Sequence, residues 1–229
     1  MATTTPNFGW SVPTSSDLVK NGATAIETLG DSIDASMAEL LGGTTGQVLS
    51  KTTATNMDFT WATPGGMTLI NTGGTALSGA SVTVSSIPST YTNLLIVLSN
   101  YYTATADSAT QIYFNGDTGA NYTYSRIRNI NATLNGASGL NTTYAEINTR
   151  SIATNTSGKT ANSQVTIYRY TDTTANKFFD YTSSAVESTN NVANVTGAAN
   201  YKGTSAISSV TVYADSNFSG GTIYVYGVK

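Results

Sequence analysis

Hydrophobic and polar residues alternate along most of the chain beyond residue 66. The clearest alternating runs are residues 165–168 (VTIY) and 210–213 (VTVY). A period of two indicates strands with one buried and one exposed face, which is typical of antiparallel sheets. Residues 94–98 (LLIVL) are continuously apolar and predict a strand at the centre of a sheet. This part of the chain, residues 67–229, is therefore predicted to form an antiparallel, jelly-roll-like β-sandwich.

The predicted strands are separated by clusters of glycine, asparagine and serine, which favour turns. Two such turns are expected at residues 115–119 and 135–139, and no helical period appears in this part of the chain. The segments that we expect to be strands are residues 67–71, 81–85, 93–99, 110–114, 122–128, 143–148, 164–170, 177–183, 192–195, 206–214 and 222–228.

The first 63 residues have a different apolar spacing, with a period of seven. A stripe of about two apolar residues per heptad predicts a helix over about residues 16–41, and suits the seam of a coiled coil. Thr14 or Ser16 can cap its first turn, and Gly42-Gly43 can end it. We expect the residues of this stripe to join copies of the chain in a homotrimer: Val19, Ile26, Leu29, Ile33 and Leu40.

The expected helix is weak when taken alone. Gly22 and Gly30 each cost about 1 kcal/mol relative to alanine, and short helices depend on packing for their stability. Mixed isoleucine and leucine seams are compatible with trimers. The alternative is that the helix lies against its own domain, and the sequence leaves both arrangements open.

A hairpin is expected after the helix, with strands at about residues 47–51 and 58–62. An isolated two-stranded hairpin is marginally stable in water, so it too needs a surface to pack on. The composition then changes at residues 63–66, because both tryptophans precede this point and all 14 tyrosines follow it. We therefore divide the chain into an N-terminal attachment and oligomerisation module, residues 1–63, and a β-sandwich domain, residues 67–229.

Composition excludes several kinds of chemistry. The 229 residues include no His and no Cys, and only 10% are charged, with a formal net charge of −3. Histidine-dependent nucleophiles, thiolate metal sites and disulfides are therefore impossible. Cations are too few for nucleic-acid binding, and no apolar run is long enough for membrane insertion. The acidic residues are widely spaced, so we expect no enzymatic activity, metal site or cofactor.

Tyrosine is the one residue type that indicates a binding surface. Together with serine, glycine and asparagine, tyrosine makes rigid contacts at low entropic cost, and its ring can stack on a sugar. The alternative for each tyrosine is ordinary packing across strands. The tyrosines beside expected turns are the candidate receptor contacts: Tyr101, Tyr102, Tyr122 and Tyr124.

Two stretches of the first module resemble a known type of protein. Residues 7–40 (NFGWSVPTSSDLVKNGATAIETLGDSIDASMAEL) and 42–64 (GGTTGQVLSKTTATNMDFTWATP) resemble an N-terminal module of tailed-phage virion proteins, usually described as tail-fibre or minor structural proteins. Residues 208–228 resemble the last two strands of β-sandwich tip modules in such proteins.

This resemblance implies a homotrimeric phage structural protein on the surface of the virion. Its N-terminus, including Phe8 and Trp10, would dock on other virion proteins of the tail or capsid, and its β-sandwich would face a host surface glycan. One alternative is a capsid decoration, or cement, trimer that stabilises the head shell. Another is an extracellular carbohydrate-binding module, against which the absence of a signal peptide argues.

Overall fold

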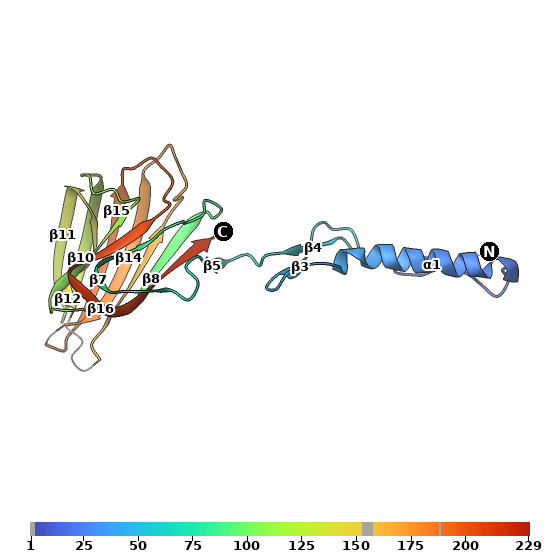
Figure 1. Cartoon of the computed structure of the whole chain (residues 1–229), viewed down its shortest axis with the longest axis horizontal. Coiled ribbons are helices and arrows are strands. Elements are labelled where there is room, and N and C mark those ends of the chain that lie inside the picture. Colours follow the sequence, from blue (N-terminus) through green and yellow to red (C-terminus); the bar gives the residue numbers. More distant parts are fainter. Residues whose placement is uncertain (1–2, 153–157, 188) are drawn as a thin grey trace. The chain divides into compact units, whose positions relative to one another are not determined.

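The computed structural model describes residues 3–152, 158–187 and 189–229 (Figure 1). The chain divides into two compact units, Met1–Gly65 and Gly66–Lys229, here called the N-terminal unit and the β unit. The predicted fold class is confirmed: the protein is mainly β, with a short helix and hairpin followed by an antiparallel sandwich.

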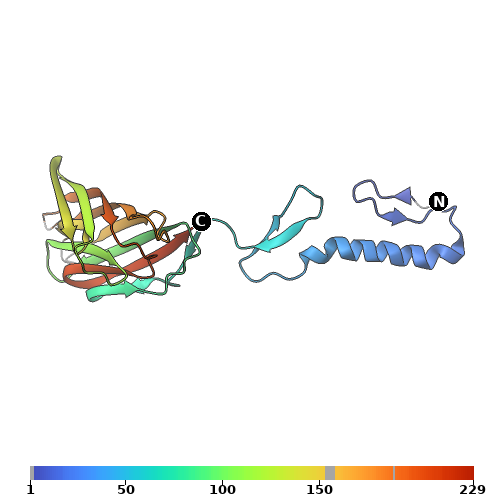
Figure 2. The same ribbon diagram turned by 90° about the horizontal axis from the view of Figure 1, so that it is seen from above.

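The N-terminal unit consists of a short arm, a helix and a hairpin. The two strands of the arm pair with each other, and β2 lies against α1 (Figure 2). A single 3₁₀ turn flanks the helix at each end. In chain order the elements are β1 (Thr3–Thr4), β2 (Ser11–Val12), η1 (Val19–Asn21), α1 (Gly22–Met37), η2 (Ala38–Leu40), β3 (Val48–Lys51) and β4 (Phe59–Ala62).

The α-helix is shorter than the sequence predicted, because neither Thr14 nor Ser16 caps it. Instead the Asp17 carboxylate accepts hydrogen bonds from the Thr14 backbone N–H (2.7 Å) and hydroxyl (3.2 Å), which hold the chain in a turn ahead of the helix. At the other end Gly42 and Gly43 both have positive φ (86° and 83°), a conformation that favours glycine and prevents the helix from continuing.

The predicted hairpin is present as β3 and β4, and it packs at the end of the helix. The Trp61 indole N–H donates to the Leu41 carbonyl oxygen (3.1 Å), and the Glu39 carboxylate accepts from the Phe59 backbone N–H. A Cβ at Gly43 would lie 2.6 Å from the Trp61 ring, so only glycine fits beneath it. The hairpin thus obtains from the helix terminus the packing surface that an isolated hairpin lacks.

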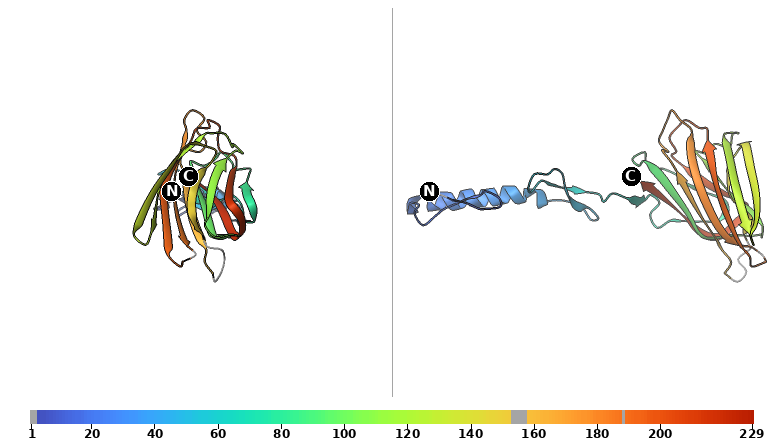
Figure 3. Two further views of the ribbon diagram at one scale, coloured as in Figure 1. Left: turned by 90° about the vertical axis from the view of Figure 1, so that its left-hand side faces the viewer. Right: turned by 180° about the vertical axis from the view of Figure 1, so that it is seen from behind.

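Twelve strands of the described β unit belong to one antiparallel sheet, which folds into two layers (Figures 1 and 3). Its order is β11-β10-β15-β14-β13-β8-β16-β9-β12, and β5, β6 and β7 also pair with β16. The strands are β5 (Met67–Leu69), β6 (Thr75–Ala76), β7 (Gly79–Val84), β8 (Asn93–Thr103), β9 (Ser108–Phe114), β10 (Tyr122–Ile130), β11 (Thr133–Thr142), β12 (Ala145–Ile152), β13 (Ala161–Ile167), β14 (Lys177–Val186), β15 (Val192–Tyr201) and β16 (Val210–Val228).

Strand β16 belongs to both layers. Its first part, from Val210, pairs with β7 and β9 of the smaller layer, and its last part, to Val228, pairs with β8 of the larger layer. The two strands predicted at residues 206–214 and 222–228 are therefore one bent strand. Close to the bend, Gly221 (φ 109°) lies against the Tyr101 backbone, where a Cβ would be 2.4 Å from the Tyr101 Cα.

The turn predicted at residues 135–139 is wrong, because these residues lie inside β11. They pair with β10 from Asn135 opposite Arg128 to Gly139 opposite Tyr124. The hairpin turn is instead at residues 131–132, both of which have positive φ. Polar residues are tolerated here because β11 is an edge strand, and Gly139 leaves room for the Tyr124 ring.

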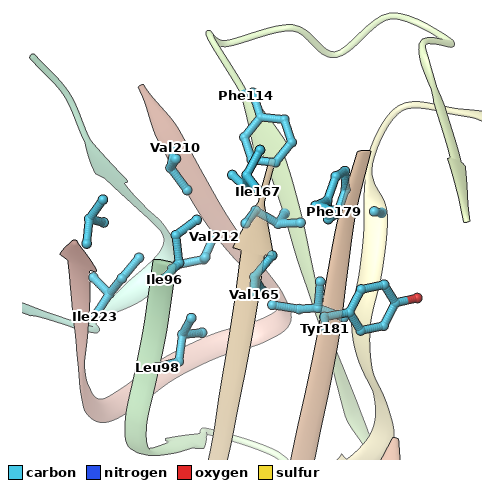
Figure 4. Packing of buried hydrophobic residues seen from close by; sticks show 14 of the residues in the cluster. Ile96, Leu98, Phe114, Val165, Ile167, Phe179, Tyr181, Val210, Val212 and Ile223 are labelled. Carbon is cyan, nitrogen blue, oxygen red and sulfur yellow. The ribbon is translucent and has the colours of Figure 1, made fainter. Parts of the chain in front are cut away.

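The core fills the space between the two layers (Figure 4). Residues 94–98 form part of β8 between β13 and β16, as their continuous hydrophobicity predicted. Alternate side chains of the larger layer point inward and meet those of the smaller layer. The labelled core residues are Ile96, Leu98, Val165, Ile167, Phe179, Tyr181 and Ile223 of the larger layer, and Phe114, Val210 and Val212 of the smaller layer.

Five tyrosines are buried in this core: Tyr101, Tyr122, Tyr170, Tyr181 and Tyr201. Burial disfavours the charged phenolate and raises the pKa of Tyr101, Tyr122, Tyr170 and Tyr181 above its ordinary value, and that of Tyr201 to about 12. The rings of Tyr122 and Tyr201 stack with their centroids 4.8 Å apart. All five are therefore neutral packing groups in the folded state.

These shifts predict an alkaline unfolding transition. The pKa of each buried phenol is higher in the folded state than the ordinary tyrosine value of 10.0, so deprotonation favours the unfolded chain. The stabilisation is complete below pH 10 and is lost as the pH rises through the folded-state pKa values. Absorbance at 295 nm should show a late, cooperative tyrosine phase that coincides with loss of near-ultraviolet circular dichroism. Titration of all tyrosines in one step near pH 10, with the fold intact, would contradict the assignment.

Candidate functional site

The residues predicted to join copies of the chain lie on the helix and its flanking turns. Val19 and Ile26 are 96% and 66% exposed, Leu40 is also exposed, and Leu29 and Ile33 are half-buried. Within α1 no residue is buried. The predicted contacts are thus present as open apolar surface, and their role between copies stays a prediction.

The arm covers one side of the helix. The Trp10 indole N–H donates to the Ser36 hydroxyl oxygen (3.2 Å), and the Phe8 ring stacks on the Trp10 ring with centroids 4.8 Å apart. On that side Ala25 and Leu29 are half-buried. The helix therefore does pack on part of its own unit, as the alternative interpretation held, but only on one side. The docking role predicted for Phe8 and Trp10 stays a prediction.

The uncovered side of the helix is apolar. Within α1, spacings of seven and four residues place Ile26, Ile33 and Met37 on one face. Val19 and Leu40, seven residues before and after the two isoleucines, lie in the flanking 3₁₀ turns η1 and η2. We call these five residues the exposed stripe; four of them are exposed, and Ile33 is half-buried. A contiguous apolar strip on a water-facing helix is typical of an association surface.

Two of the four candidate receptor tyrosines are not at the surface, so this prediction is wrong for Tyr101 and Tyr122. Both are 0% exposed. The Tyr101 hydroxyl shares a hydrogen bond with the Ser163 hydroxyl (2.7 Å) and accepts one from the Asn148 amide (2.8 Å). The Tyr122 hydroxyl oxygen accepts from the Phe114 backbone N–H (2.9 Å). Alternation along β8 and β10 points these rings into the core, where no receptor can reach them.

The other two candidates are half-buried. The Tyr102 ring covers Gly220, where a Cβ would lie 2.4 Å from the Tyr102 Cε1. The Tyr124 hydroxyl donates to the Glu146 carboxylate (3.3 Å), and burial together with that negative charge raises the pKa of Tyr124 to about 12. Both tyrosines keep part of their surface accessible, so their contact with a receptor stays a prediction.

Tyr124 also lines an open groove on the larger layer. The groove has a volume of about 430 Å³ and crosses β11, β10, β15 and β14. Its most exposed apolar walls are Leu140 (75%) and Phe178 (61%). Sequence reasoning missed Phe178 because it considered only tyrosines. The sequence did contain a signal for Phe178. Neighbouring residues of a strand point to opposite faces, so Phe178 and Phe179 cannot both be buried in the same core.

Other kinds of site are not found in the described part of the chain. Residues 3–152, 158–187 and 189–229 contain no group of three or more acidic, histidine or cysteine side chains that could hold a metal ion. Among the same residues, no helix has the length and hydrophobicity needed to cross a membrane.

Comparison of the chain with protein-family models, curated proteins and solved structures gives no match.

Replacing Tyr122 with phenylalanine tests its structural role. Tyr122→Phe removes the acceptor of the buried Phe114 N–H and should lower the free energy of unfolding by about 1–3 kcal/mol. Tyr102→Phe is the matched control, because within the described residues the Tyr102 hydroxyl makes no hydrogen bond. Urea unfolding followed by circular dichroism gives both values. Equal stability of the two variants would show that the Tyr122 hydroxyl is not needed for folding.

Proposed function

We propose that the protein is a structural component of a phage virion, a homotrimeric tail fibre or appendage. Its N-terminal unit joins the copies and docks on the particle, and its β unit faces the host surface. The proposal rests on the resemblance of residues 7–40 and 42–64 to such modules, together with the burial pattern of the two units.

The observation that carries the proposal is the lack of a core in the N-terminal unit. Among its described residues, 3–65, every side chain is exposed or half-buried, whereas the β unit has a continuous core. Complete burial of an isoleucine contributes about 1.5–3 kcal/mol. The exposed stripe therefore holds several kcal/mol that the single chain does not use, and association of copies would supply the missing contacts.

The sequence of the stripe supports a small parallel bundle. Val19, Ile26 and Ile33 are β-branched and seven residues apart, and Gly30 lies between the last two on the same face, where it allows close approach. Three copies around one axis would bring the three β units to the same end of the assembly. Weak single contacts with a repeated host ligand then become strong through multivalency.

The β unit supports a role in surface contact. Its outer groove combines the exposed ring of Phe178 with small polar side chains such as Thr123, Ser138 and Asn200. An aromatic ring beside hydroxyl and amide groups matches the apolar faces and hydroxyl groups of a sugar. We therefore add Phe178, on the outer face, to the candidate glycan contacts Tyr102 and Tyr124. The Tyr124 hydroxyl itself points to the inner face, towards Glu146.

The double substitution Ile26→Asp with Ile33→Asp tests the assembly. Two layers of carboxylates would be buried between copies, and self-association should weaken by about 3–5 kcal/mol. The matched control is Thr28→Asp with Ala35→Asp, which has the same charge and spacing on the opposite face of α1. Sedimentation equilibrium should show dissociation of the first variant only. A trimer that resists the first pair, or is disrupted equally by both, would place the interface elsewhere.

A truncated chain tests which unit holds the copies together. Residues 66–229 contain the whole hydrophobic core cluster, so they should fold alone with a melting temperature within about 3 °C of that of the full chain. Light scattering should find this fragment monomeric. A stable trimer of the fragment would assign the assembly to the β unit instead.

Immunoelectron microscopy and a binding assay test whether the protein belongs to the tail or to the head of the virion. Gold-labelled antibody against the β unit should mark tail appendages in electron micrographs, and the purified protein should adsorb to host cells. Label confined to the head, without adsorption, would favour a capsid decoration trimer and overturn the appendage assignment.

A further inference from the structure

Two arginines lie on the inner face of β10, near the edge of the sandwich. Arg126 and Arg128 are two residues apart on one strand, so their side chains share a face, whereas Ser125 and Ile127 are exposed on the other. Across the gap between the layers, β12 contributes Glu146 and Thr149. Together with Asn135 of β11, these side chains line a cavity of about 190 Å³.

One of the two guanidinium groups is neutralised. Arg126 Nη2 lies 3.0 Å from Glu146 Oε1, and both side chains are largely buried, at 11% and 15% exposed. The other carboxylate oxygen of Glu146 accepts from the Tyr124 hydroxyl (3.3 Å). Each oxygen of Glu146 therefore already has a donor, and Glu146 leaves Arg128 without a counter-charge.

One buried N–H group of the pair lacks an acceptor, and the second guanidinium group has no carboxylate partner among the described residues. Arg126 Nε is buried and has no hydrogen-bond partner. Arg128 Nη1 donates to the Thr149 hydroxyl at 3.4 Å, and in the described residues no carboxylate pairs with Arg128. Buried donors without acceptors are rare, and where they occur an ion or a water molecule commonly satisfies them. The cavity lining thus has a net charge of +1 and donors in excess.

We propose that this cavity binds one oxyanion group, namely a carboxylate, a phosphate or a sulfate. The planar fork of an arginine matches two oxygens of such a group, and charge-assisted hydrogen bonds are stronger than neutral ones. The Asn135 amide can supply a further donor at the rim. The cavity is smaller than the 300 Å³ or more of a typical site for a whole organic ligand, so it accommodates the charged group and leaves any attached molecule outside.

The same chemistry can come from two sources, a free inorganic anion or an acidic substituent of a larger molecule such as a uronic acid sugar. The inference does not depend on the proposed assembly role. The cavity lies within one β unit and is lined by residues of a single chain.

Isothermal titration calorimetry on the full chain tests the inference, with sodium phosphate and sodium glucuronate as probes and glucose as the neutral control. We expect saturable binding of at least one anion, with one site per chain, and no binding of glucose. Arg128→Gln should weaken that binding at least tenfold. Arg169→Gln is the matched control, because Arg169 is 75% exposed and pairs with Asp172 away from the cavity.

The two anions distinguish the sources. Binding of phosphate alone would indicate a free inorganic ligand, and tighter binding of glucuronate would indicate the acid group of a sugar. Absence of saturable binding of both anions up to about ten millimolar would overturn the inference. Equal weakening by Arg128→Gln and Arg169→Gln would also overturn it, because it would show attraction to overall charge.

A second variant keeps the test valid if Arg128→Gln does not fold. Asn135 lies on the exposed edge strand β11, so Asn135→Ala should leave the circular dichroism and melting temperature unchanged. It should still weaken anion binding severalfold, through loss of one donor at the rim. The variant Arg128→Lys keeps the positive charge and removes the guanidinium fork. If neither Asn135→Ala nor Arg128→Lys changed the affinity for the anion, neither the amide nor the fork would hold it, and the inference would be overturned.

Discussion

The backbone pairing of β16 is the constraint on which the β unit depends. This strand of 19 residues pairs with β5, β6, β7, β8 and β9, and it passes from the smaller layer to the larger one. Its buried residues therefore contribute to both walls of the core. The passage needs Gly221 because the Tyr101 backbone lies where a side chain would be. By pairing with both β8 and β9, β16 joins the layer that carries Arg126 and Arg128 to the layer that carries Glu146.

The two units meet the requirement for apolar burial in different ways. The β unit satisfies it within one chain, and even its tyrosines are used for packing. Among its described residues, the N-terminal unit leaves Val19 and Ile26 in water, with the arm against one side of α1 and the hairpin against the turn that follows it. Such a chain, in which one unit has a hydrophobic core and the other has none, is suited to assembly. Association of copies stabilises the unit that has no core and leaves the core of the other unit unchanged.

The candidate binding residues show the limit of reasoning from residue type. Tyrosine was chosen as the indicator of a binding surface because of its chemistry, yet Tyr101 and Tyr122 are core residues and Phe178 is at the surface. Which face of a strand is buried depends on the partner layer, and the register of one residue decides it. The same holds for Arg126 and Arg128, whose spacing of two was visible but whose inward direction was not.

The sequence by itself determined the mainly β class, the positions of most strands, the hairpin and a helix with one apolar stripe. These features depend on local periodicity and on turn residues such as Gly42, which act within a few residues of the chain. Only the tertiary structure decided that β16 is one strand in two layers, that residues 135–139 form an edge strand, and that Glu146 neutralises Arg126 but not Arg128. Such outcomes depend on contacts between residues far apart in the chain, and local patterns carry no information about which distant strand will supply the partner.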